Sequence, residues 1–160
     1  MKAASGSGEQ EHEGIGELLF RLDDEALLIL RAHLLTERYL WKFLDRELAT
    51  QFLSKEVNLR YHQLVALSKI VAQNETLDWF WDFLSNLNRV RNVLAHEIVD
   101  SEKMDSLIAS VFQKATPHID LDPFARRPRV ERLRWLFMIL CGVADSLPER
   151  VEKERSAKKE

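Results

Sequence analysis

The chain has 160 residues, of which 46% are hydrophobic and 31% charged, and its formal net charge is −3. This length suits one domain with a single core, and the weakly negative charge excludes attraction of the whole chain to nucleic acid. Its single cysteine, Cys141, excludes an internal disulfide framework. No segment approaches the ~18 consecutive apolar residues of a membrane span, and the N-terminal stretch shows no secretory pattern. We therefore expect a cytoplasmic protein without membrane contact.

Residues 1–16 are rich in Gly, Ser and Glu and are predicted to be a disordered tail before a helical domain of residues 17–148. The first long helix is expected to begin at Asp23 or Asp24, since either can cap it. Apolar residues then follow spacings of three and four residues, which is typical of a helix burying one stripe. Glu37 interrupts this stripe, whose apolar members are Leu27, Leu30, Leu34, Trp41, Leu44 and Leu48.

A second helix is predicted over residues 58–73, and a third is expected to follow a cap at Thr76. The third helix carries its own apolar stripe, which Arg91 interrupts; the other members are Leu77, Phe80, Leu84, Leu87, Leu94 and Ile98. Because a buried charge is costly unless it is paired, Glu37 and Arg91 are expected either to meet or to line one polar cleft. The alternative places Glu37 at the edge of its helix, in water.

The remaining chain predicts further helices and no strands. One helix should begin after residue 101, a loop with three prolines covers residues 116–128, and a last helix opens near Pro128. Residues 149–160 are nearly all charged and are predicted to be a solvated tail or a frayed helix. No stretch alternates with period two, so we predict an all-α, up-and-down bundle of about five helices.

Arg91-Asn92 followed by Leu94-Ala95-His96 resembles the R-N-x-x-A-H form of the R-x(4–6)-H motif of the HEPN superfamily. The helix order agrees, and the resemblance covers roughly residues 20–145. It implies a HEPN-like fold and a metal-independent endoribonuclease, acting as a homodimer whose two motifs meet at a cleft. It also implies the toxin of a toxin–antitoxin or defence system, with RNA and an antitoxin protein as partners.

The chemistry of HEPN ribonucleases suits these residue types. His96 would act as general base on the ribose 2′-hydroxyl, and Arg91 would bind the scissile phosphate. Asn92 would orient either group, while Asn88, one turn earlier in the same polar row, and Glu37 are expected to contact the substrate. The alternative is a non-catalytic, dimeric binding or regulatory protein, in which Arg91 pairs with Glu37 and His96 caps a helix end.

Three further features bear on this hypothesis. Ile98 stands where a toxin subgroup of the family has the tyrosine of R-x4-H-x-Y, which puts regulation by nucleotide transfer to that tyrosine in doubt. Arginines around the start of the last helix predict binding of RNA phosphate, or alternatively a solvated face balanced by acids; they include Arg126, Arg127 and Arg129. His33 and Glu37 could supply two metal ligands, but no third is evident, so we expect neither metal nor cofactor.

Overall fold

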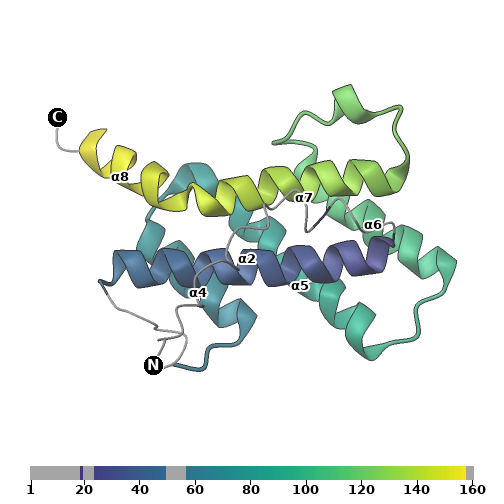
Figure 1. Ribbon diagram of the computed structural model, residues 1–160, viewed down its shortest axis with the longest axis horizontal. Coiled ribbons are helices and arrows are strands. Elements are labelled where there is room, and N and C mark those ends of the chain that lie inside the picture. The colour runs from purple at the N-terminus through teal and green to yellow at the C-terminus, as the bar shows by residue number, and fades with distance from the viewer. Residues whose placement is uncertain (1–18, 20–23, 50–56, 158–160) are drawn as a thin grey trace, which may run out of the picture.

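The structure is a computed structural model that describes residues 19, 24–49 and 57–157, so the predicted tail of residues 1–16 lies outside the described residues. All regular structure in these ranges is helical, which confirms the predicted all-α bundle (Figure 1). The α-helices are α2 (Glu25–Glu47), α4 (Tyr61–Ala72), α5 (Asp78–His96), α6 (Ser101–Ala115), α7 (Arg129–Asp145) and α8 (Leu147–Ala157). Two 3₁₀ turns, Glu75–Leu77 and Asp122–Phe124, precede α5 and α7. None of the described helices is long and apolar enough to cross a membrane.

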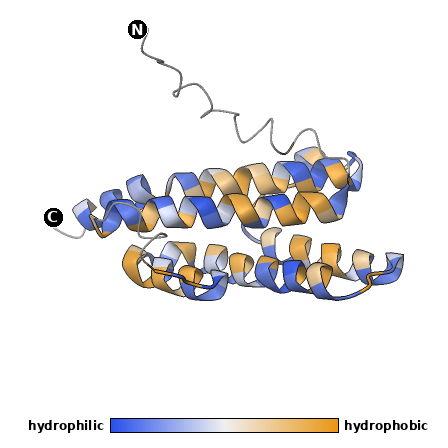
Figure 2. Cartoon of the chain, turned by 60° about the horizontal axis from the view of Figure 1, so that its bottom comes forward, coloured by the Kyte–Doolittle hydropathy of each residue, from blue (hydrophilic) through white to orange (hydrophobic). Residues whose placement is uncertain are grey.

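Helix α2 is the centre of the bundle. It begins as predicted, because the Asp24 carboxylate accepts a hydrogen bond of 2.9 Å from the Leu27 backbone N–H and caps the first turn. Helices α4, α5, α7 and α8 all contact it, and the bundle forms two layers (Figure 2). An element contacted on several sides buries more than one stripe, and this decides which of its residues form the core.

The predicted apolar stripe of α2 is therefore wrong in part. Leu34 is 59% exposed, and Leu27 and Leu48 are also exposed. The neighbouring rows face the core instead, with Leu28, Ile29, Ala32, Leu35, Leu40 and Phe43 buried, and Leu44 of the predicted stripe is buried with them. Leucine-rich helices satisfy three-four spacing along several rows at once, so spacing alone does not identify the row that is covered.

Helix α5 buries its aromatic residues within the chain. Phe80, Trp81 and Phe83 are all buried, and Trp79 stacks on His118 with ring centroids 5.1 Å apart. Intramolecular packing thus accounts for aromatics on several sides of this helix. Two predictions for its ends are wrong. The hydroxyl of Thr76 donates to the side chain of Asn74 and caps nothing, and the helix stops at His96, which leaves Ile98 fully exposed.

Residues 147–157 form helix α8, and most of them lie in the segment predicted to be a solvated tail or a frayed helix. Val151 is buried, and Arg155 donates to Glu47 of α2 at 2.6 Å. Arg46 of α2 lies 3.4 Å from Glu152. A few apolar residues with ion pairs on either side are enough to dock this charged segment against α2.

Candidate active site

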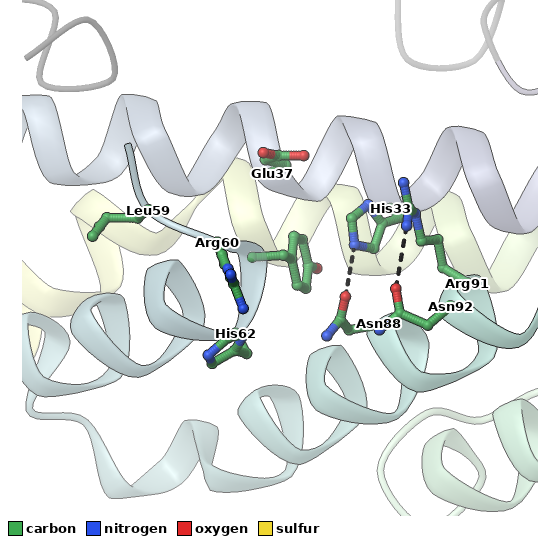
Figure 3. Close-up of a pocket in the computed structure, with 9 residues that line it drawn as sticks. His33, Glu37, Leu59, Arg60, His62, Asn88, Arg91 and Asn92 are labelled. Atoms are coloured by element: carbon green, nitrogen blue, oxygen red, sulfur yellow. Dashed lines mark hydrogen bonds between the residues drawn. The ribbon is translucent and has the colours of Figure 1, made fainter. Parts of the chain in front are cut away.

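An open cleft of about 410 Å³ lies between α2, α4 and α5 (Figure 3). Its size falls within the ~300–1,000 Å³ range of small-molecule sites, but its lining is mostly polar. Helix α2 contributes His33 and Glu37, and α5 contributes Asn88, Arg91 and Asn92. The start of α4 and the residues before it contribute Leu59, Arg60, Tyr61 and His62.

Glu37 and Arg91 both line this cleft. Their places on the apolar stripes predicted either a direct contact or a shared polar cleft, and the structure has the shared cleft. Among the described residues they form no ion pair with each other. The guanidinium Nη1 of Arg91 instead donates to Oδ1 of Asn92 at 3.2 Å. Arg91 is half-buried and its charge is not neutralised by a bonded carboxylate of the described chain. The cleft therefore presents a cation that can bind an anionic group.

His33 forms the floor of the cleft, and only 5% of this residue is exposed. Its Nε2 lies 3.2 Å from Oδ1 of Asn88, and its ring stacks on Tyr61 with centroids 3.9 Å apart. The Tyr61 hydroxyl is in turn 2.8 Å from the Thr36 hydroxyl. A carbonyl oxygen can only accept, so Nε2 of His33 carries the proton and donates to Asn88. This bond fixes the Asn88 amide, and its NH₂ group has no hydrogen-bond partner among the described residues.

Burial lowers the pKa of His33 from its ordinary value of 6.5; the Asn88 bond opposes the shift, and the positive charge of Arg91 adds to it. The folded state then binds fewer protons at this site than the unfolded state.

We expect the free energy of unfolding to fall as the pH drops below 6.5, because stability rises with pH wherever the unfolded state binds more protons. Thermal melts between about pH 8 and pH 5 measure this dependence. His33→Gln should flatten the profile while His62→Gln, at an exposed imidazole, should not; equal slopes in wild type and His33→Gln would contradict the assignment.

His96 does not line the cleft. It is the last residue of α5, and it is exposed. Five residues separate it from Arg91, which turns it about 140° around the helix axis. Of the three residues predicted to be catalytic, the cleft of a single chain therefore contains Arg91 and Asn92 only.

The predicted arginine cluster lies elsewhere, and its contacts join helices together. Arg129 donates through Nε and Nη2 to the two carboxylate oxygens of Glu25, at 2.6 and 2.7 Å, and also pairs with Asp105. These bonds connect the start of α7 to α2 and α6. Arg127 is 3.5 Å from Glu131, and Arg126 is exposed. None of these three arginines lines the cleft, and the ion pairs agree with a face balanced by acids.

The cleft also contains residues that the sequence did not single out as functional. Arg60 and His62 come from the start of α4, and Tyr61 lies between them in the chain. No spacing or motif marks this triplet, because its place in the site depends on how α4 packs against α2. His33 was considered only as a metal ligand with Glu37. No group of three or more His, Cys, Asp or Glu side chains suited to a metal occurs in the described part of the chain.

Comparisons of this chain with protein-family models, with curated proteins and with solved structures find no match.

Proposed function

We propose that the chain is a HEPN-type, metal-independent endoribonuclease. The observation that carries this proposal is the state of Arg91, the first residue of the R-N-x-x-A-H motif. Its guanidinium lies in an open polar cleft, bonded to Asn92 and to no carboxylate of the described residues. A guanidinium in this setting binds a phosphate through paired N–H groups and stabilises charge that develops on its oxygens.

The proposed reaction is transesterification of RNA. A base takes the proton of a ribose 2′-hydroxyl, the 2′-oxygen forms a bond to the adjacent phosphorus, and the bond from phosphorus to the 5′-oxygen breaks. The 5′-oxygen takes up a proton as it leaves, so the products are a 2′,3′-cyclic phosphate and a 5′-hydroxyl end. In this proposal His96 is the base. Because His96 lies outside the cleft of its own chain, the proposal includes a homodimer in which His96 of the partner subunit completes the centre.

A ribonuclease without a metal requirement is active as soon as it folds, and this suits the toxin of a toxin–antitoxin or defence system. We include an antitoxin protein among its partners and place the activity in the cytoplasm. Ile98 in place of the tyrosine speaks against control by modification at that position, so we propose control by binding of the antitoxin.

The second candidate function is a non-catalytic dimeric binding or regulatory protein. The exposed position of His96, outside the cleft, favours it. It shares with the first candidate an anion site at Arg91 and differs in having no chemistry. Binding of RNA without cleavage by wild-type protein would support this second candidate.

The test is cleavage of an end-labelled RNA in the presence of a chelator. Arg91→Ala is expected to lower the rate by roughly 10²-fold or more, the usual cost of removing a group that stabilises transition-state charge. Arg89→Ala is the matched control, because this arginine lies on the same helix but donates to Asn86 and Ser110, on the side towards α6. A wild-type protein that leaves RNA intact, or an Arg91→Ala variant as active as Arg89→Ala, would refute the proposal.

A further inference from the structure

Two guanidinium groups line the cleft, that of Arg91 on α5 and that of Arg60, which directly precedes α4. Neither forms an ion pair with a carboxylate of the described residues. The backbone N–H of Arg60 donates to the side chain of Gln63 at 2.9 Å, so the cap of α4 does not occupy the Arg60 guanidinium. The cleft therefore presents two cations whose N–H groups can bind anionic oxygens.

A carboxylate lies between these two cations. Burial is the main cause of the lowered pKa of His33 and the raised pKa of Tyr61, but the charge of Arg91 adds to the first shift and the charge of Glu37 to the second. Arg91 is thus near His33, and Glu37 is near Tyr61, the chain neighbour of Arg60. Figure 3 shows Arg60 at one end of the cleft and Arg91 at the other, with Glu37 over the middle. The order along the cleft is cation, carboxylate, cation.

This order of charges disfavours one phosphate bound to both arginines. The Glu37 carboxylate has no hydrogen-bond partner among the described residues, and it repels a phosphate placed beside it. In a nucleic acid strand, the unit between two phosphates is an uncharged nucleoside, whose amino and hydroxyl groups donate bonds that a carboxylate accepts. The cleft volume of about 410 Å³ is that of a small-molecule site, which suits one such unit.

The Arg60 end of the cleft is also rigid and electropositive. Helix α4 begins there, and the first turn of a helix carries partial positive charge and N–H groups without intrahelical partners. Tyr61 stacks on His33 and bonds to Thr36, which fixes this end of α4 to α2. We infer that Arg60 binds the phosphate next to the one that Arg91 holds, so that the cleft takes a single RNA strand across two consecutive phosphates. This rests on the RNA-binding part of the proposed function.

The experiment removes the charge of one phosphate at a time. The substrate is a DNA strand with a single ribonucleotide, so that only one bond has the 2′-hydroxyl needed for cleavage. In two further strands, the phosphate on the 5′ or the 3′ side of the scissile one is an uncharged methylphosphonate. Wild type is expected to lose roughly 10–100-fold in kcat/KM with one of these replacements, the usual value of a hydrogen bond between charged groups.

The variant Arg60→Ala is expected to lose as much on the unmodified strand and little more on the modified one, because both changes remove the same contact. Arg60→Lys keeps the charge and should recover part of the loss. Lys69→Ala is the matched control: this cation of α4 lies outside the cleft, 2.9 Å from Asp78, and its removal should leave the response to the methylphosphonate unchanged. Thermal melting checks that Arg60→Ala is folded, as the exposure of Arg60 leads us to expect.

The outcomes separate this inference from the proposed function. If Arg60→Ala cleaves the unmodified strand as wild type does, or if its loss and that of the methylphosphonate multiply, Arg60 does not bind this phosphate and the ribonuclease proposal stands. Binding of the same strands with a 2′-O-methyl group at the ribose gives a second readout. If wild type cleaves nothing but its Kd shows the same non-additive losses, the ribonuclease proposal fails and the assignment of Arg60 stands. If binding is absent or does not respond to Arg60→Ala either, both fail.

Discussion

His96→Ala is expected to lower RNA cleavage by roughly 10²–10⁴-fold, the usual contribution of a general base. Expression of the wild-type chain should arrest growth of its host, and the same substitution should relieve the arrest. The exposed position of His96 makes this a clean test, because truncation of an exposed side chain changes stability little. Equal growth with wild type and His96→Ala, at equal expression, would count against catalysis by this imidazole.

Subunit mixing shows whether His96 acts in its own chain or in the partner. Arg91→Ala and His96→Ala chains are each expected to be inactive alone. After exchange, the mixture should recover about a quarter of wild-type activity, because about half of the dimers are heterodimers and each has one intact centre of two. Labelled subunits report whether exchange has occurred. A mixture that remains inactive after proven exchange would place Arg91 and His96 in one chain.

Much of the fold was predictable from local patterns. Helical periodicity without alternation identified the all-α class, and the Asp24 cap marks the start of α2 as expected. The two charges that interrupt apolar stripes, Glu37 and Arg91, lead to the same cleft. Each of these predictions depends on a few residues close together in the sequence, or on the cost of burying one charge. Both can be judged without knowing how the helices pack.

The misses share another cause, which is packing between segments far apart in the sequence. Leu34 fits an apolar stripe as well as Leu35 does, yet only Leu35 is covered. The sequence left a solvated tail or a frayed helix open for residues 149–160, and contacts with α2 decide for helix α8. His33 lies among leucines, and nothing in its spacing reveals that it faces Asn88 across the bundle. Tertiary contacts decide all three, and a single sequence does not contain them explicitly.

The cleft and the core are coupled through Tyr61. One face of its ring covers His33, which holds Asn88, and its hydroxyl meets Thr36 on α2. Tyr61 also holds the start of α4 in place, and its chain neighbours there, Arg60 and His62, line the cleft. Damage at this position should therefore reach both the stability of the bundle and the arrangement of the cleft.

Tyr61→Ala is expected to lower the free energy of unfolding by about 3–5 kcal/mol, the usual cost of truncating a large buried aromatic residue. Tyr61→Phe should cost only about 0.5–1.5 kcal/mol, because it keeps the stack on His33 and loses one hydrogen bond. Thr36 retains its bonds to the backbone carbonyls of Ala32 and His33 in that variant, so its hydroxyl is not left unsatisfied.

Chemical denaturation of the three proteins measures these differences, and Ile70→Ala is the matched control. Ile70 lies on the same helix but is 67% exposed, so its truncation should change the free energy of unfolding by less than about 0.5 kcal/mol. If Tyr61→Ala costs no more than Ile70→Ala, Tyr61 does not anchor the cleft. If Tyr61→Phe lowers the free energy of unfolding as much as Tyr61→Ala does, the hydroxyl bond to Thr36 rather than the ring holds the start of α4 in place.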